Sequence, residues 1–246
     1  MNEPDTLRLA SYNVRKCIGL DRRRRPGRVI EVINAIGADV IALQEADKRL
    51  GERPAALPAR LIEEDTDFWA VPVGTSERSL GWHGNAVLVR KGLPVTHLRR
   101  IALPGTEPRG AVAVEIGGRL RFVAVHLGLL RRDRTRQLEA LRTAMNGAAA
   151  STAILGDFNE WSDTRGLEPL EGVFTVHSPG ASYHAARPVA ALDRVALGAG
   201  LELRDAGVIE GGKARYASDH LPIWADVRPG APLAGPITPA PAGPAS

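Results

Sequence analysis

Short apolar runs, several of them alternating with polar residues, recur along most of the chain and predict β-strands. We expect strands at residues 7–13, 40–44, 68–71, 85–90, 95–101, 111–116, 120–126, 152–155, 192–197, 201–203 and 222–227. Gly117 and Gly118 separate two of these runs and are typical of a tight hairpin turn. The pattern therefore predicts a protein rich in strands, with its densest strand region in the middle of the chain.

Apolar residues at helical spacing predict two main helices. The first follows Pro26 and ends before Gly37, and the second covers residues 131–146, with Gly147 as its C-cap. We expect a short helix at 58–64 and another helical segment near Leu167. Since helices alternate with strands at both ends, the pattern predicts a mixed α/β domain with helices outside the sheets.

The domain is expected to cover residues 1–228 as one unit. From Pro229 the chain has no charged residue and repeats Pro, Ala and Gly, so we expect a disordered tail at 229–246. No internal repeat and no earlier linker divides the sequence.

The composition is that of a globular protein, with 246 residues, 44% hydrophobic and 24% charged. We expect no signal peptide, since residues 1–6 lack an apolar segment, and no membrane insertion, since no apolar run is long enough to span a bilayer. The single cysteine, Cys17, excludes an internal disulfide and fits a reducing compartment. We expect a cytoplasmic monomer. The net charge of +4 fits either an anionic partner or a mildly basic surface.

Polar side chains follow several predicted strands at the point where each strand ends. Asn13, Glu45 and His126 end three of them, and Asp157 with Asn159 ends a fourth. Ligand sites of α/β folds lie at strand ends. Asp157 and Asn159 share one face of an extended chain, and burying both is costly unless a cation or a phosphoryl oxygen is bound there. Alternatively, Gly156 to Asn159 form an ordinary Asx turn.

Six separated segments resemble the motifs of the endonuclease/exonuclease/phosphatase family, in that family's order. They are Ser11-Tyr12-Asn13, Leu43-Gln44-Glu45, Gly84-Asn85-Ala86, Val125-His126-Leu127, Gly156-Asp157-Phe158-Asn159 and Ser218-Asp219-His220, and Leu192-Asp193-Arg194-Val195 resembles a seventh. The resemblance covers residues 7 to about 227 and makes 1–228 a catalytic domain. It implies a four-layer α/β sandwich, in which two mixed β-sheets pack face to face with helices on the outside.

The resemblance also implies a role for each matching residue. Glu45 is the main carboxylate ligand of Mg²⁺ or Mn²⁺, with Asn13 beside it and Asp219 as a second acid near the metal. Asp157 and Asn159 orient the attacking water and hold the phosphoryl oxygen. His220 acts on the scissile phosphate with Asp193 as its carboxylate partner. His126 matches the branch that includes pancreatic-type deoxyribonucleases and neutral sphingomyelinases. Residues expected to contact the substrate phosphate are Arg15, Asn85 and Arg109.

Elementary chemistry supports these roles. Mg²⁺ prefers oxygen ligands, which a Glu, Asn and Asp set supplies, and a histidine held by a carboxylate has a fixed tautomer. Structural alternatives exist for the single residues. Asp193 could form a local ion pair with Arg194, His126 could be a buried core residue, and Arg15 and Arg109 could be surface arginines.

Two positions depart from the family pattern. His83 stands where deoxyribonuclease-like members have a glutamate that supports the first histidine, so His126 could lack a carboxylate partner. Arg194 follows Asp193 where many members have a histidine, which indicates a distinct subgroup of bacterial hydrolase type. The sequence predicts a metal-dependent phosphodiesterase, with a nuclease as one form of it. The alternatives are a phospholipid-headgroup phosphodiesterase or phosphatase, and a phosphate-binding module without turnover.

Overall fold

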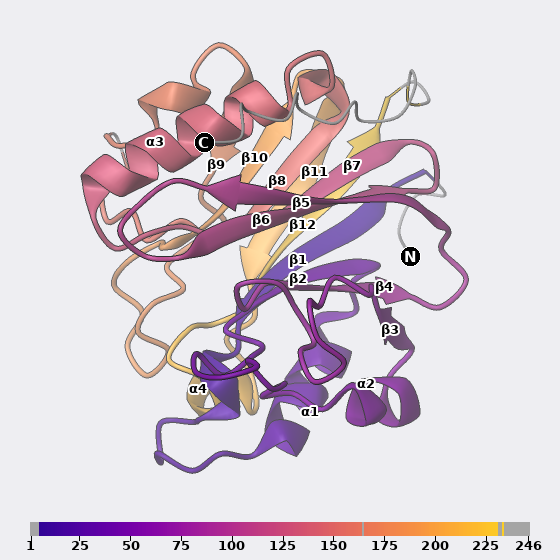
Figure 1. Ribbon diagram of the computed structural model, residues 1–246, viewed down its shortest axis with the longest axis vertical. Coiled ribbons are helices and arrows are strands. Elements are labelled where there is room, and N and C mark those ends of the chain that lie inside the picture. The colour runs from indigo at the N-terminus through magenta and orange to yellow at the C-terminus, as the bar shows by residue number, and fades with distance from the viewer. Residues whose placement is uncertain (1–4, 164, 231–232, 234–246) are drawn as a thin grey trace.

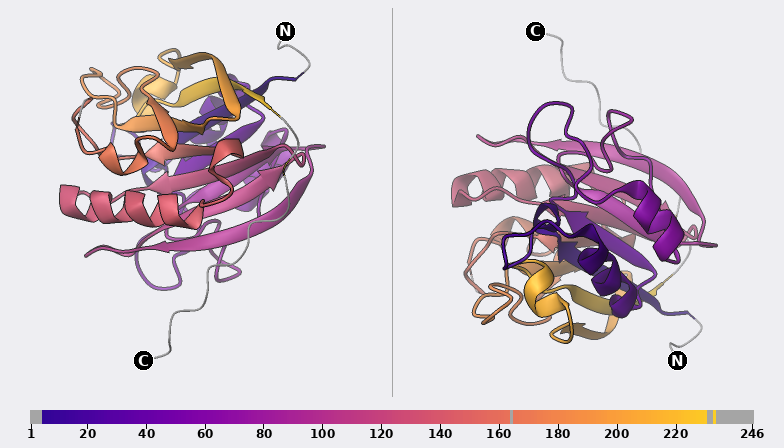
Figure 2. Two further views of the ribbon diagram at one scale, coloured as in Figure 1. Left: turned by 90° about the horizontal axis from the view of Figure 1, so that it is seen from above. Right: turned by 90° about the horizontal axis from the view of Figure 1, so that it is seen from below.

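Two mixed β-sheets pack face to face, and helices cover their outer faces (Figures 1 and 2). The computed structural model describes residues 5–163, 165–230 and 233, so most of the tail expected at 229–246 lies outside the described residues. Each sheet has six strands in the described part of the chain. The four-layer α/β sandwich that the sequence predicted is therefore confirmed.

The first sheet has the strand order β11-β12-β1-β2-β4-β3. Its strands are β1 (Leu7–Asn13), β2 (Val40–Gln44), β3 (Phe68–Ala70), β4 (Ala86–Arg90), β11 (Leu201–Val208) and β12 (Ile223–Pro229). Strands β1 and β2 are parallel, and the other pairs are antiparallel. Helices α1 (Pro26–Ile36), α2 (Ala59–Asp65) and α4 (Ala214–Ala217) lie on its outer side (Figure 1).

The second sheet has the order β5-β6-β7-β8-β10-β9. Its strands are β5 (Val95–Leu103), β6 (Arg109–Ile116), β7 (Leu120–His126), β8 (Thr152–Asp157), β9 (Phe174–His177) and β10 (Asp193–Gly198). Here β7 and β8 form the parallel pair. Helix α3 (Arg131–Ala144) covers the outer face through Leu138 and Leu141. Three short 3₁₀ turns complete the described chain: Arg15–Cys17, Ala149–Ser151 and Glu168–Leu170.

The core has three parts because the central strands are buried on both faces. In β2, Val40 and Ala42 pack between the sheets, whereas Ile41 and Leu43 pack against α1. This division follows from the two-residue repeat of a strand, which turns successive side chains to opposite faces. A third cluster lies between the second sheet and α3. Each central strand is thus held on both sides, which gives its end a rigid position.

The two parallel pairs decide where the site lies. Parallel strands end on the same edge, so β1 and β2 deliver Asn13 and Glu45 together, and β7 and β8 place His126 opposite Asp157. Strand β10 is antiparallel to β8 and therefore begins at the edge where β8 ends. Asp193, the first residue of β10, thus also lies opposite Asp157. Contacts join β1 and β2 to β7 and β8 across the sandwich, so one edge collects residues from both sheets.

Most predicted elements are present, and the main differences concern β9, α4 and the end of α3. Strand β9 and helix α4 were not predicted, because both are short and depend on packing for their stability. The prediction that Gly147 caps the long helix was wrong. Helix α3 ends at Ala144, and Met145, which is fully buried, leaves helical geometry to pack into the core. Across the described residues, no helix is both long enough and apolar enough to cross a membrane.

Candidate active site

The carboxylate of Asp157 is the centre at which the polar strand ends meet. Its Oδ2 accepts a hydrogen bond of 3.0 Å from Nδ2 of Asn13 and lies 3.4 Å from Nε2 of His126 and 3.7 Å from Nε2 of His220. Its Oδ1 accepts the backbone N–H of Asn159 at 2.9 Å. Asn13, His126, Asp157 and His220 are all at most 5% exposed. Segments far apart in the sequence thus converge on one buried carboxylate.

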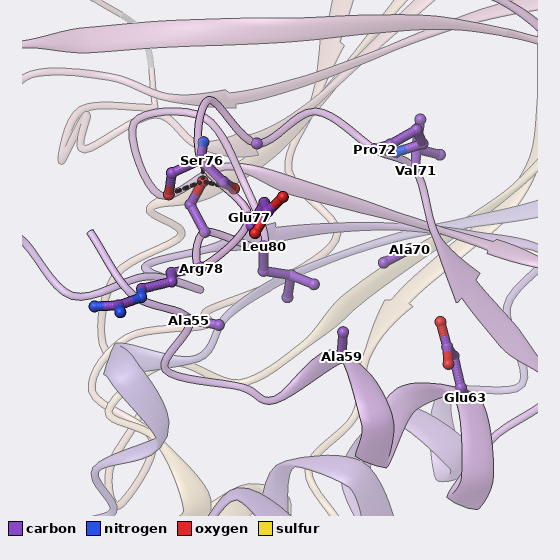
Figure 3. A pocket seen from close by; sticks show the side chains of 12 residues that line it. Ala55, Ala59, Glu63, Ala70, Val71, Pro72, Ser76, Glu77, Arg78 and Leu80 are labelled. Atoms are coloured by element: carbon purple, nitrogen blue, oxygen red, sulfur yellow. Dashed lines mark hydrogen bonds between the residues drawn. The ribbon is translucent and has the colours of Figure 1, made fainter. Parts of the chain in front are cut away.

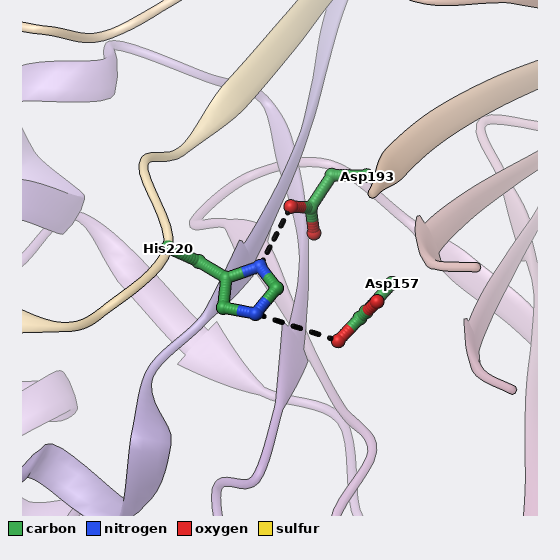
Figure 4. A group of neighbouring side chains, drawn as sticks. All are labelled: Asp157, Asp193 and His220. Atoms are coloured by element: carbon green, nitrogen blue, oxygen red, sulfur yellow. Dashed lines mark hydrogen bonds and ion pairs between the residues drawn. The ribbon is translucent and has the colours of Figure 1, made fainter. Parts of the chain in front are cut away.

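His220 lies between two aspartates, as Figure 4 shows. Its Nδ1 is 2.8 Å from Oδ2 of Asp193, which places the Nδ1 proton on that contact and turns Nε2 toward Asp157. The hydroxyl of Ser182 donates to the same oxygen of Asp193 at 2.6 Å. Asp193 does not pair with Arg194, since Nη2 of that arginine lies 2.8 Å from Oδ1 of Asp163. The carboxylate and the hydroxyl therefore fix the orientation of the ring.

The two aspartates also decide the charge of His220. Burial lowers the pKa of its imidazole, but the charges of Asp193 and Asp157 outweigh burial and raise the pKa to about 10. Burial raises the pKa of Asp157 to about 6, with His220 opposing this shift and Asp193 adding to it. Near neutral pH the arrangement is an imidazolium held between two carboxylates.

His126 has the opposite electrostatic environment. Burial, together with the positive charge of Arg109, lowers the pKa of His126 well below its ordinary value, so the ring is neutral. The carboxylate beside it is that of Asp157. His83, which occupies the position of the family's supporting glutamate, instead has its Nδ1 3.2 Å from Nη1 of Arg53. One neutral and one charged histidine thus flank the same aspartate.

The carboxylate of Glu45 forms an ion pair with the ammonium group of Lys16. Asp219 is 3.2 Å from Nε of Arg15, and the backbone N–H of Arg15 donates to Oδ1 of Asn13 at 3.1 Å. All three expected metal ligands therefore present oxygens at this edge, and two of them already have cationic partners from the turn after β1. Lys16 was not among the residues that sequence analysis selected, because a single lysine after a strand carries no signal of its own.

Backbone geometry at this edge is unusual. Several residues that are not glycine have positive φ: Arg15 (46°), Lys16 (54°), Glu45 (53°), His83 (50°) and Asn159 (52°). Each such conformation costs about 1–3 kcal/mol and tends to persist where packing enforces it, often in functional sites. Gly156 serves a different purpose, since a Cβ there would lie 2.0 Å from the carbonyl oxygen of Val125. A glycine is therefore required to bring Asp157 beside β7.

The remaining expected residues have structural contacts. Asn85 is fully buried, and its Nδ2 donates to the carbonyl oxygen of Gly110 at 2.8 Å, which ties the start of β4 to β6. Arg109 is 6% exposed and donates to Glu107 at 2.7 Å. Asn159 donates through Nδ2 to the carbonyl oxygen of Leu127 at 2.9 Å. Ser182, which sequence analysis missed, lies in a loop without periodicity, and nothing local marks it as a partner of Asp193.

A separate hollow lies between α2 and the loop at residues 72–80 (Figure 3). Its charged lining residues are Glu63, Glu77 and Arg78, and Arg78 pairs with Glu52 at 2.9 Å. The two carboxylates outweigh the one guanidinium, which disfavours an anionic ligand. This hollow is therefore less suited to a phosphate than the edge around Asp157.

Comparison with known proteins agrees with this geometry. The sequence description of the Endonuclease/Exonuclease/phosphatase family matches residues 10–220 of this chain, which includes every candidate site residue. The chain belongs to the endonuclease/exonuclease/phosphatase family. Members of this family are hydrolases that act on phosphoric esters and are typically metal-dependent.

The relatives differ in the activities that their names describe, and the fold is shared with those of them that have solved structures. The uncharacterized protein YbhP of Escherichia coli K12 is 31% identical over 171 residues, which are 60% of this chain and 63% of that protein. An endonuclease/exonuclease/phosphatase of Beutenbergia cavernae superposes with a TM-score of 0.70 at 22% identity, covering 92% of this chain and 72% of the other. The D. rerio protein TDP2, solved with a single-strand DNA product, has a TM-score of 0.69 at 17% identity, with coverages of 90% and 98%. A mannosyl-6-phosphatase of Bacteroides thetaiotaomicron has a TM-score of 0.71 at 15% identity, with coverages of 90% and 99%.

Proposed function

We propose that the protein hydrolyses phosphodiesters with the help of Mg²⁺ or Mn²⁺ and that its substrate is a nucleic acid. The observation that carries the proposal is the buried arrangement of Asp193, His220 and Asp157, with His126 on the other side of Asp157. It supplies both a carboxylate that can orient an attacking water and a cationic imidazole that can stabilise charge on a phosphoryl oxygen.

In this proposal each residue acts from the position it already has. Asp157 orients the water, and Asn13 and Asn159 hold its carboxylate through one hydrogen bond to each oxygen. His220 donates from Nε2 to a phosphoryl oxygen, and Asp193 keeps Nδ1 protonated and the ring in place. His126, being neutral, can donate to or accept from the phosphate without adding charge. The fixed partners reduce the reorganisation that the transition state requires.

The oxygens of Glu45, Asn13 and Asp219 fit a hard divalent cation. The Lys16 ammonium beside Glu45 indicates that this carboxylate attracts positive charge. Asp157, Asp193 and His220 also have ligand atoms within 4.8 Å of one another, but a metal there would displace the contacts of His220 to both carboxylates. When bound, the ion would polarise the phosphoryl oxygen and lower the pKa of a coordinated water.

Aromatic side chains beside His220 favour a nucleic acid over the other phosphoesters. The ring centroids of Tyr183 and His220 are 5.0 Å apart. The ring centroids of Trp161 and Tyr183 are 5.8 Å apart, with the two rings edge to face. Trp161 is 62% exposed. Tyr183 is half-buried, so the exposed Trp161 ring, supported by Tyr183 next to a phosphate site, offers a surface on which a base can stack. The structural neighbours include a DNA-bound protein and a sugar phosphatase at similar TM-scores, so the fold alone does not choose between these substrates.

A substrate panel tests the proposal directly. Purified protein with Mg²⁺ is given bis(p-nitrophenyl) phosphate, p-nitrophenyl phosphate, single-stranded and double-stranded oligonucleotides, and phosphatidylcholine vesicles. We expect hydrolysis of the diester and of oligonucleotides, with the monoester and the lipid turned over much more slowly. Trp161→Ala should weaken cleavage of oligonucleotides more than cleavage of the small diester. If only the monoester or only the lipid is cleaved, the proposal is wrong and the protein is a phosphatase or a phospholipid phosphodiesterase. If the folded protein cleaves none of the substrates, the alternative of a phosphate-binding module without turnover is favoured.

A further inference from the structure

A basic pocket lies next to the candidate active site, on the side of Glu45 and His126. It continues into a second hollow, and four residues line both: Arg49, Arg53, His83 and Arg109. We call these four residues the arginine pocket. They come from the loop after β2, the turn before β4 and the start of β6, so the pocket is assembled by tertiary packing.

Arg109 is the residue in this pocket that indicates a ligand. It is 6% exposed, and its Nη2 donates to Glu107 at 2.7 Å, yet its buried Nε has no hydrogen-bond partner among the described residues. A buried charged donor without a partner is costly. Arg109 lines both hollows, so an anion bound there would lie beside its guanidinium group.

The charge balance of the pocket favours a phosphate. Among the described residues that line it, Arg49 and Arg109 share Glu107, at 4.0 Å and 2.7 Å. The other carboxylates are engaged elsewhere, because Glu45 pairs with Lys16 and Asp47 accepts the backbone N–H groups of the loop before Trp82. Guanidinium groups in excess over carboxylates suit a phosphate, which they bind through paired hydrogen bonds.

His83 holds Arg53 in place without neutralising it. Its Nδ1 is 3.2 Å from Nη1 of Arg53, so the ring accepts that hydrogen bond as a neutral imidazole. Burial, with the charges of Arg53 and Arg109, lowers the pKa of His83 and keeps it neutral. The ring of Trp82 packs against His83 at 4.6 Å between centroids. A carboxylate at this position would also bind Arg53, but it would cancel one of the positive charges of the pocket.

We propose that the arginine pocket binds a second phosphate of the substrate, the one adjacent to the scissile phosphate in a nucleic-acid strand, and that His83 positions Arg53 for this contact. The inference rests on the proposed function and deepens it. Arg131 and Arg134, at the start of α3, do not offer an equivalent site, since both pair with Glu160. The arginine pocket, in contrast, opens beside His126.

Binding measured in EDTA separates this site from catalysis. The probes are the thymidine trinucleotide TpTpT, which has two phosphates, and the dinucleotide TpT, which has one, titrated by calorimetry at several salt concentrations. For the wild type we expect tighter binding of TpTpT. His83→Glu and Arg53→Gln should each reduce the ratio of the two affinities about tenfold, the loss expected for one charged hydrogen-bonding contact. Both variants should also bind TpTpT with a weaker dependence on salt. The slope of the logarithm of the binding constant against the logarithm of the salt concentration should be smaller in magnitude by about 0.7.

Matched variants make the result specific. His83→Gln has the shape of His83→Glu and the same positive φ, but it stays neutral and keeps an acceptor for Arg53, so its ratio should stay near that of the wild type. Arg60→Gln, on the exposed side of α2, controls for overall charge. The proposal would be overturned if His83→Glu and His83→Gln had the same ratio of TpTpT affinity to TpT affinity. Tighter binding of inositol 1,4-bisphosphate than of TpTpT would overturn its assignment to nucleic acid. If the wild type binds TpTpT more tightly than TpT as expected but cleaves no diester in Mg²⁺, the proposed function is wrong, whereas the proposed phosphate binding by the arginine pocket is supported.

Discussion

Oδ2 of Asp193 lies 2.8 Å from Nδ1 of His220, and the opposite nitrogen of the same ring faces Asp157 at 3.7 Å. The first contact is a formed hydrogen bond, whereas the second is longer than a hydrogen bond, so the Nε2 proton is not committed to Asp157. A phosphoryl oxygen that approaches Nε2 would meet a cationic N–H whose direction is already set. In the proposed mechanism this relationship makes Asp193 a positioning residue that acts through His220.

Removal of the imidazole tests this arrangement. We expect His220→Ala to lower kcat for a diester by about two to four orders of magnitude, the range for a positioned acid–base group, while KM changes much less. The interaction is lost mainly in the transition state. Steady-state kinetics with bis(p-nitrophenyl) phosphate measure both constants. Near-normal kcat would show that the reaction takes place elsewhere.

Asp193→Asn tests whether the aspartate works through the histidine. The ring remains but loses its charge support, so we expect a smaller fall in kcat in the same direction. The double variant should match His220→Ala alone, because residues that act as one unit are not additive. Circular dichroism checks that each variant is folded. Fully additive losses would mean that Asp193 and His220 act independently.

Metal dependence should follow from the oxygens around Glu45. We expect EDTA to abolish hydrolysis and Mg²⁺ or Mn²⁺ to restore it. Glu45→Gln should raise the metal concentration required for half-maximal rate, with little change in melting temperature in EDTA, because Glu45 is partly exposed and packs no core. Glu63→Gln, at the hollow in Figure 3, is the matched control and should leave the metal requirement unchanged. Full activity in EDTA would contradict the assignment.

Gly156→Ala should destabilise the fold. The new Cβ would lie 2.0 Å from the carbonyl oxygen of Val125, so β7 and β8 would have to separate. Overpacking of this kind costs about 1–3 kcal/mol or more, which should lower the melting temperature by several degrees. Gly27→Ala, in α1, is the control, since nothing lies within 4 Å of where the added Cβ would be. Alanine should be neutral or stabilising there. Similar melting temperatures for the two variants would contradict the predicted clash.

The thiol of Cys17 should be unreactive in the folded protein. Cys17 is fully buried, and burial raises the pKa of its thiol from 9.0 to about 12. Iodoacetamide at pH 8 should therefore modify native protein far more slowly than protein in denaturant. The folded state keeps the thiol neutral while the unfolded state ionises above pH 9, so stability falls as the pH rises from 9 toward 12. Urea unfolding of the wild type and of Cys17→Ala should show a steeper loss for the wild type over this window.

Local sequence was sufficient for the elements that carry the site. The bounds of β1, β2 and β7 match their predicted ranges, and α1 ends at Ile36 before Gly37, whose φ of 64° favours glycine. These features depend on the spacing of apolar side chains and on the backbone preferences of single residues, both of which can be read locally. The polar residues at strand ends are visible for the same reason, because a buried strand makes an adjacent carboxylate or histidine stand out.

Tertiary structure alone decided which of these residues meet. Nothing in the sequence pairs Ser182 with Asp193, directs Arg194 to Asp163 rather than to its neighbour, or brings Arg53 to His83. These partners lie in loops or turns, where no periodicity marks a direction. Their contacts form because two parallel strand pairs pack across the sandwich and bring distant loops to one edge. Contacts of this kind depend on the packing of the whole chain, so no local pattern encodes them.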